Sequence, residues 1–233
     1  MLSCIRWIFI FAFTGGVAAM QLKAQDSIRE KPISPQRFNT VIKTNPLPVL
    51  WGPVPLTAEF RIIREITVAT NQSMELGFSY LGKSPLFSIL ENGLNQNSQV
   101  KIYVTGFRLQ MAHKFYLNEV LEKMEMIEFD YAPVGFYIAP HISYSSAKFT
   151  YKFLNRYDVY IRGNHFNINL LGGYQALIND QFAVDFFAGM GYKKNRWTEH
   201  SPPNNIVPVD MGLGGFYNSN VKLILGFNAG IAF

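Results

Sequence analysis

The sequence predicts an all-β fold: a single eight-stranded antiparallel up-and-down β-barrel that crosses an outer membrane with its strands. Its 233 residues are 48% apolar and 15% aromatic but only 16% charged, whereas an ordinary soluble domain has about 25% charged residues. After the first 25 residues, no apolar run reaches the roughly 20 residues that a membrane-spanning helix needs. Apolar and polar residues alternate instead over about eight segments, and an even number of antiparallel strands can close into a barrel.

The first segment of the chain is expected to be a targeting sequence rather than part of the fold. Residues 1–25 have a positive charge at Arg6, then a short apolar run and small residues, which is typical of a secretory signal peptide. Residues 26–37 then form an N-terminal periplasmic segment, and residues 38–233 form the transmembrane barrel. Cys4, the one cysteine, lies in the signal, so the mature chain has no disulfide and no cysteine metal site.

The clearest strand is the last one, residues 220–233. Every second residue in it is apolar, and the residues between them are mostly small or polar. The same period of two predicts seven earlier strands, within residues 38–50, 56–63, 73–80, 103–115, 135–144, 166–176 and 182–192. The first of these is the weakest, because Pro46 and Pro48 cannot donate a hydrogen bond to a neighbouring strand.

The strands of a soluble β-sandwich or a lipocalin-like barrel also alternate between apolar and polar residues. The choice between a soluble fold and a membrane barrel therefore depends on the composition of the two faces. Soluble strands average about 5–6 residues, and their outer face is rich in Lys, Glu and Thr. Here several segments are about twice that length, and their polar face is mostly Gly, Ser and Asn with a few charges. Small residues fit the crowded inside of a narrow barrel and a long aromatic-rich face fits lipid, so the membrane barrel is favoured.

Loop lengths assign the two ends of the barrel, because outer-membrane barrels have short periplasmic turns and longer external loops. Residues 70–73 and 178–181 are tight polar turns and are expected on the periplasmic side. Residues 194–219 are then external. Trp51 and Trp197 fall at this external end, where we expect them to form part of an interfacial aromatic girdle.

Two of the connections are expected to contain a short helix. In residues 83–98, Ser84 followed by Pro85 is a good N-cap and first-turn pair. The apolar residues that come after this pair give the helix a side that could lie at the membrane rim or cover the barrel. Residues 117–132 are long and acidic for a periplasmic turn, and they are either a solvated insertion or a docking site for a periplasmic partner.

Four stretches of the mature chain carry a family resemblance: KTNPLPVLWGPVPLTAEFRI, SYLGKSPLF, APVGFYIAPHISYSSAKF and GFNAGIAF. With them the chain resembles an uncharacterised family of small Gram-negative outer-membrane β-barrel proteins with an OmpA/OmpX-like barrel architecture. The resemblance runs from about residue 38 to the end and implies a location in the cell outer membrane, but no reaction or ligand. The C-terminal strand resembles the signal that the barrel-assembly machinery recognises, which carries over to Phe227, Ile231 and Phe233. The stretch 117–132 is longer than that family's usual turn.

Eight charged residues fall on the inner face of the barrel by alternation: Lys43, Glu59, Arg61, Glu75, Arg108, Lys114, Asp185 and Lys222. An eight-stranded barrel is just wide enough for side chains to fill it, and an unpaired buried ion costs several kcal/mol. Since the two signs nearly balance, we expect a network of paired charges that blocks the lumen. A conducting pore and a ligand-binding lumen are the alternatives.

The tripeptide His141-Ile142-Ser143 is the one candidate for catalysis. Two residues apart on a strand, His141 and Ser143 share a face, so an imidazole could take the proton of a serine nucleophile. The pattern resembles the His-x-Ser of outer-membrane lipid A deacylases. Because Ile142 faces lipid by the alternation, His141 and Ser143 face inward, and a hydrogen-bonded pair in the lumen is the simpler interpretation.

Other classes of function find little support in the sequence. His113, His165 and His200 are scattered without metal-ligand spacing, and no motif indicates a cofactor. Lys and Arg outnumber Asp and Glu only by 21 to 16 and form no basic run, so nucleic acid is not an expected partner. We therefore expect a non-catalytic structural or interaction role in the envelope. Outer-membrane lipid, the assembly machinery and an envelope protein are the expected partners; a lipid hydrolase or a narrow pore is the alternative function.

Overall fold

The computed structural model describes residues 39–50, 52, 57–94, 100–123, 132–153, 159–179, 181–201, 205–208 and 219–233. The chain divides into two units, residues 1–36 and residues 37–233. The first unit lies outside the described residues, and so do the expected signal peptide, the whole of the expected periplasmic segment, and Trp51. Every described residue belongs to the second unit.

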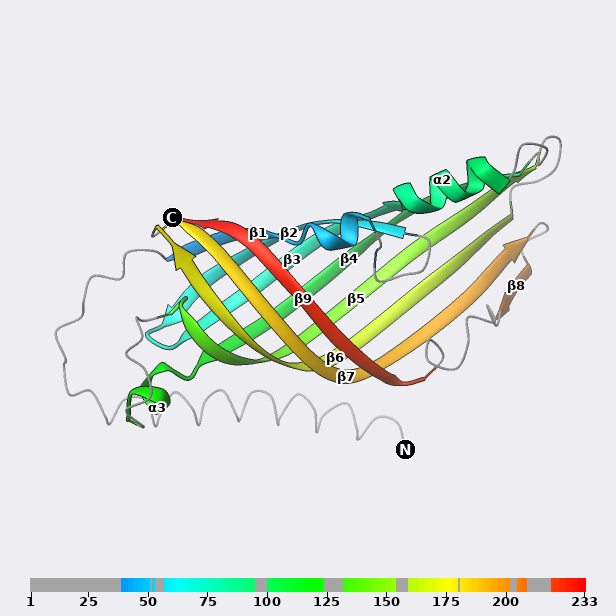
Figure 1. Ribbon diagram of the computed structural model, residues 1–233. Helices are drawn as coiled ribbons and strands as arrows, with labels where there is room; N and C mark the ends of the chain where they lie inside the picture. Colours follow the sequence, from blue (N-terminus) through cyan, green and yellow to red (C-terminus); the bar gives the residue numbers. More distant parts are fainter. Residues whose placement is uncertain are drawn as a thin grey trace, which may run out of the picture. The chain divides into compact units, whose positions relative to one another are not determined.

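Nine strands and three short helices make up the described part of this unit (Figure 1). The strands are β1 (Thr40–Thr44), β2 (Thr57–Ala69), β3 (Gln72–Lys83), β4 (Val100–Tyr116), β5 (Gly135–Phe153), β6 (Val159–Ile178), β7 (Phe182–Ser201), β8 (Asn205–Pro208) and β9 (Val221–Ala232). The helices are η1 (Leu47–Val49), α2 (Pro85–Leu94) and α3 (Asn118–Lys123).

The strands form a closed barrel of eight. From β1 to β7 each strand pairs antiparallel with the next, β7 pairs with β9, and β9 pairs with β1. The remaining strand, β8, pairs with the last four residues of β7 and with no other described strand. The predicted all-β, eight-stranded antiparallel up-and-down barrel is therefore confirmed.

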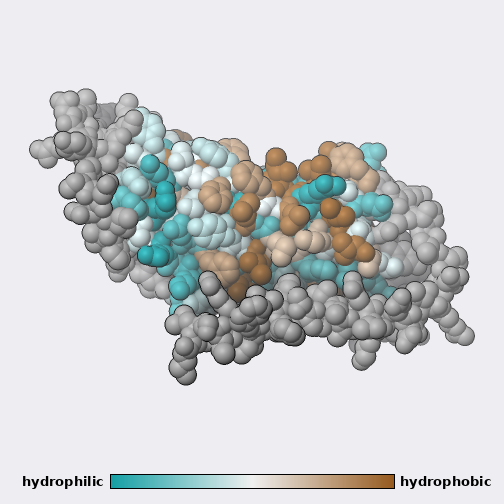
Figure 2. All heavy atoms as spheres, turned by 180° about the vertical axis from the view of Figure 1, so that it is seen from behind, coloured by the Kyte–Doolittle hydropathy of each residue, from teal (hydrophilic) through white to brown (hydrophobic). Residues whose placement is uncertain are grey.

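The alternation in the sequence becomes an apolar outer face and a polar inner face. On β6, the outward Leu170 is 57% exposed while its neighbour Asn169 is 4% exposed. On β9, Leu225 is 88% exposed and Asn228 only 3%. Figure 2 shows apolar residues gathered over the middle of one face of the barrel and hydrophilic residues gathered toward one end.

The short turns and the C-terminus meet at one end of the barrel. The amide of Ala232 donates to the carbonyl of Gln181 at 2.8 Å, and the amide of Ala132 donates to the carbonyl of Thr70 at 3.0 Å. Asn179 takes a positive φ of 52°, a conformation that Asn tolerates better than most residues and that suits a tight turn. The two predicted short turns thus share one end, and their periplasmic orientation remains an expectation.

The predicted helix in the β3–β4 connection is confirmed as α2. The hydroxyl of Ser84 accepts a hydrogen bond from the amide of Phe87 at 3.4 Å and donates one to the carbonyl of Leu50 at 2.7 Å. This N-cap also fixes α2 against the β1–β2 connection. In the acidic insertion α3 forms one short helix, and residues 124–131 lie outside the described chain. Within the described chain, no helix is both long and apolar enough to cross a membrane.

The expected girdle position of Trp197 is wrong. Trp197 lies on the inner face of β7, is 8% exposed, and packs among Leu81 and Phe149. Its ring covers Gly163 on the neighbouring strand, where a Cβ atom would lie 2.5 Å from the indole. The alternation of β7 continues past Tyr192 to this level of the barrel, and the glycine leaves the space that an inward indole needs.

Candidate functional site

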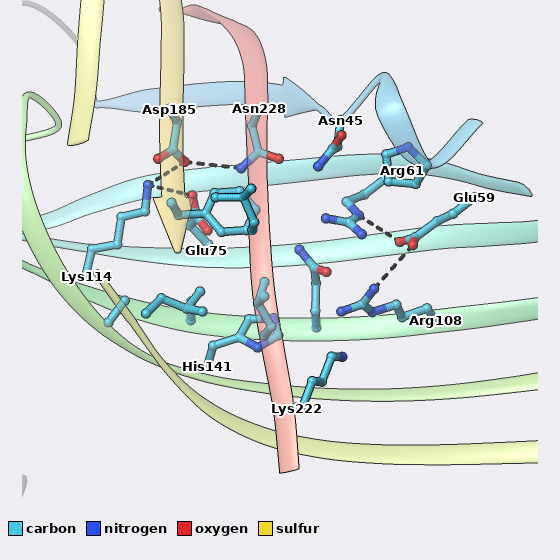
Figure 3. Close-up of a pocket in the computed structure, with 18 of the residues that line it drawn as sticks. Asn45, Glu59, Arg61, Glu75, Arg108, Lys114, His141, Asp185, Lys222 and Asn228 are labelled. Carbon is cyan, nitrogen blue, oxygen red and sulfur yellow. Dashed lines mark hydrogen bonds and ion pairs between the residues drawn. The ribbon is translucent and has the colours of Figure 1, made fainter. Parts of the chain in front are cut away.

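Two lysines and three carboxylates form a buried cluster in the half of the barrel that holds the short turns. Figure 3 shows three of them, Lys114, Glu75 and Asp185. This lysine cluster consists of Lys43, Lys114, Glu65, Glu75 and Asp185. The Lys43 ammonium lies 2.7 Å from Glu65 and 2.9 Å from Asp185 and also contacts Glu75. The Lys114 ammonium lies 2.9 Å from Asp185 and 3.0 Å from Glu75. The residues come from β1, β2, β3, β4 and β7, so the cluster ties strands together across the lumen.

Neutral side chains complete the hydrogen bonding of the lysine cluster. The Tyr137 hydroxyl donates to Asp185 at 2.6 Å, and the Tyr116 hydroxyl donates to Glu65 at 2.8 Å. Gln175 accepts from Lys114 at 2.8 Å and from Lys43 at 3.1 Å. Because carboxylates outnumber ammonium groups here, these hydroxyl donors are needed to satisfy the extra negative charge in a buried site.

A second group, the arginine cluster, lies further along the lumen and consists of Glu59, Arg61 and Arg108 (Figure 3). The Glu59 carboxylate accepts from Arg61 Nε at 2.7 Å and from Arg108 Nη1 at 3.2 Å. The Ser79 hydroxyl donates to the same carboxylate at 2.6 Å. In the arginine cluster the cations outnumber the anions, since two guanidinium groups share one carboxylate.

A cavity of about 250 Å³ separates the two clusters. Glu75, Lys114 and Asp185 line it on one side, and the arginine cluster lines it on the other. His141 and Lys222 also face into this cavity (Figure 3). The β1–β2 connection covers part of it with Asn45, Pro48 and Gly52.

The structure brings seven of the eight predicted inner charges into ion pairs; Lys222 is the exception. Within the described residues, no side chain forms a hydrogen bond or ion pair with Lys222, although its side chain lines the cavity with Arg61 and Arg108. The predicted assembly residues Ile231 and Phe233 are exposed on the outer side, and their role in assembly stays a prediction.

Sequence reasoning missed Glu65, which is fully buried at the centre of the lysine cluster. The alternation that places Glu59, Arg61 and Ile63 inside also places Glu65 inside, but the predicted strand ends at residue 63, whereas β2 continues to Ala69. Extending the same period by two residues finds it.

His141 and Ser143 do face inward, yet they are not arranged as a base and a nucleophile. His141 Nδ1 lies 2.9 Å from the Asn169 amide nitrogen. The Ser143 hydroxyl accepts from Asn167 at 3.2 Å and from Arg108 at 3.3 Å. In the described part of the chain no hydrogen bond joins His141 to Ser143, and no carboxylate orients the imidazole. Nor is any group of three or more His, Cys, Asp or Glu among these residues placed to hold a metal ion.

Comparison with known proteins adds little to this description. The chain matches no protein-family model, and no curated protein matches it in sequence; the resemblance to an uncharacterised outer-membrane family stays a prediction. Among solved structures, the chain is similar to a major outer membrane protein from Thermus thermophilus. The two share 12% sequence identity with a TM-score of 0.46, over 83% of this chain and 98% of that one. The assignment of the fold rests on the closed ladder of strands itself.

Proposed function

We propose that this protein is an outer-membrane β-barrel with a non-catalytic structural or interaction role in the bacterial envelope, its lumen blocked by paired charges. The observation that carries the proposal is the combination of an apolar outer face with a buried ionic network in one closed barrel. Outer-membrane lipid surrounds the barrel in this proposal. The barrel-assembly machinery inserts it, and an envelope protein is a further partner.

The outer face supports a lipid environment. Leu170, Met190 and Leu225 are all more than half exposed and lie on adjacent strands. Soluble monomers rarely expose contiguous apolar patches larger than a few hundred Å². Burying such a side chain in an apolar medium stabilises it by about 1.5–3 kcal/mol, and lipid tails can supply that medium.

The limit of the apolar band supports an orientation in the membrane. Outward residues on β5–β7 are apolar up to Tyr144, Phe166 and Tyr192, and beyond them lie the exposed cations Lys194 and Arg196. β6 and β7 have 20 residues each, about twice the 9–11 that cross a bilayer. Their far ends therefore extend into water, on the external side in this proposal.

Cysteine labelling tests this placement. The mature chain would have no native cysteine, so single substitutions report cleanly. In intact cells, Arg196→Cys is expected to react with a membrane-impermeant maleimide, while Leu170→Cys is expected to be protected at least tenfold until the membrane is dissolved. Equal labelling at both positions in intact cells would contradict the proposal that the apolar outer face lies within the membrane.

Planar-bilayer recording tests the blocked lumen. Since the lysine cluster and its hydroxyl donors fill the lumen near one end, the purified protein is expected to give no discrete conductance steps at low or high ionic strength. Heat-dependent migration on a gel serves as the control that the inserted protein is a folded barrel. Reproducible steps from the folded band would favour the narrow pore instead.

A further inference from the structure

We propose that the cavity between the two clusters binds the carboxylate head of a long-chain fatty acid, whose chain leaves the lumen sideways past β9 and lies on the outer face. This inference goes beyond the proposed function and rests on its membrane placement. It is carried by three features: an excess of cations at the cavity, a gap in the strand pairing beside it, and an apolar groove that adjoins it.

The cations at one side of the cavity exceed the anions. Arg61, Arg108 and Lys222 line this side with Glu59 as the one carboxylate among the described lining residues there (Figure 3). Arg108 is only 6% exposed, and its Nε atom has no hydrogen-bond partner among the described residues. Buried donors without partners are costly, and a bound anion with two oxygens would satisfy Arg108 and Lys222 together.

The carboxylates on the opposite side of the cavity determine at which side such an anion can bind. Glu75 and Asp185 face the cavity there beside Lys114. With Glu65 they make the lysine cluster rich in carboxylates, which would repel a second anion. The head group therefore belongs beside Arg108 and Lys222.

The wall of the barrel is incompletely paired beside Lys222. β1 pairs with β9 only from Thr44 and Ala229 toward the short-turn end. Over residues 221–228, β9 pairs with β7 on one side, and no described strand pairs with its other side. Across the gap, β2 has no described strand partner other than β3 over residues 57–62.

The cavity reaches the outer surface at this gap. Its lining includes the inward Lys222 and Asn228 of β9 and also the outward Leu223 and Leu225 of the same strand. A single cavity can touch both faces of one strand only around the edge of that strand. Among the described residues, the unpaired edge of β9 thus gives an opening from the lumen toward the lipid, beside the β1–β2 connection, whose Pro48 and Gly52 also line the cavity.

An apolar groove of about 730 Å³ begins at the same place. It shares Leu225 with the cavity and runs over β9, β7 and β6, where Phe227, Phe186 and Tyr174 line it. The cavity, at about 250 Å³, is smaller than the roughly 300–1,000 Å³ of a site that encloses a whole ligand. A polar chamber for the head and an apolar groove for the chain together fit a single-chain anionic amphiphile.

Photocrosslinking tests the proposal on the full barrel in nanodiscs of zwitterionic lipid. The probe is a long-chain fatty acid with a diazirine on the chain, and mass spectrometry locates the label. We expect labelling concentrated on residues 223–227 and reduced at least tenfold by Lys222→Met. Lys222→Arg, which keeps the charge, should retain labelling, and Lys194→Met on the outer face is the matched control without effect.

Three results would overturn the proposal. Equal labelling by the matched fatty alcohol would mean that no anionic head is recognised. Competition by millimolar acetate or inorganic phosphate as effective as that by unlabelled fatty acid would assign the site to a free anion. Label spread evenly around the outer face would mean ordinary contact with lipid. Heat-dependent migration of every variant separates these outcomes from failure of the membrane barrel, which would show itself as a protein that stays folded and monomeric without detergent.

Discussion

Replacing Lys43 by methionine is expected to lower the free energy of unfolding by about 3–5 kcal/mol, the usual cost of removing one partner from a buried ion network. Lys43 is 1% exposed and contacts Glu65, Glu75 and Asp185. Methionine has a similar length but no charge. The variant therefore leaves three buried carboxylates to share the single ammonium of Lys114.

Urea titration of the barrel in lipid, read by heat-dependent gel migration, measures this loss. The control is Lys194→Met, which removes an exposed lysine and should change stability by no more than about 0.5 kcal/mol. Adding Glu65→Gln to Lys43→Met removes part of the excess negative charge, so the double variant should lose less than the sum of the two single losses. A Lys43→Met protein as stable as the native one would show that the network does not hold the barrel together.

The alternation of the sequence predicts which residues lie inside, but not which of them meet. Period two alone assigns Lys114 and Asp185 to the inner face, and both lie there. Their contact depends on how far each strand is shifted against the next when the sheet closes. Lys43 and Asp185 are 142 positions apart in the chain. Their contact depends on the register of every strand pair between them, and a local sequence pattern does not predict that register.

The errors and omissions occur where the predicted strands are too short. Glu65 and Trp197 both lie beyond the segments that alternation predicts, and in each case the same period continues into the described strand. Lengths are hard to predict because strands outside the membrane no longer need apolar residues on their outer face. Lys194 and Arg196 interrupt the apolar pattern of β7 without ending the strand.

The sequence predicts only part of the gap in strand pairing beside β9. Pro46 and Pro48 indicate that the first strand is interrupted, since proline cannot donate to a ladder. In the structure β1 ends at Thr44, and the Asn45 side chain accepts from the amide of Leu47 at 3.1 Å to start η1. The sequence does not reveal that no other described strand fills the place, because that depends on where β9 and β2 lie in the closed barrel.

Replacing Leu170 by arginine is expected to destabilise the barrel by about 2–4 kcal/mol, the cost of Arg on the lipid face near the middle of a bilayer. Leu170 points outward from β6 and is flanked by Pro140 on β5 and Met190 on β7. No acidic side chain is present at these flanking positions to pair with the guanidinium. The cost arises from lipid alone, because the inner face is unchanged.

The matched control for this substitution is Ser146→Arg, on the outward face of β5 at the edge of the apolar outer face. Ser146 lies between Asn164 on β6 and Phe107 on β4. This is an interfacial position, from which a long arginine side chain can reach water, so the substitution should cost about 0–1 kcal/mol. Urea titration in lipid measures both variants. The comparison also separates the membrane barrel from a soluble lipocalin-like barrel, because in water an exposed Leu-to-Arg change on a surface strand would be nearly neutral and would improve solubility. Equal stability of the two variants would therefore show that the apolar outer face does not lie against lipid.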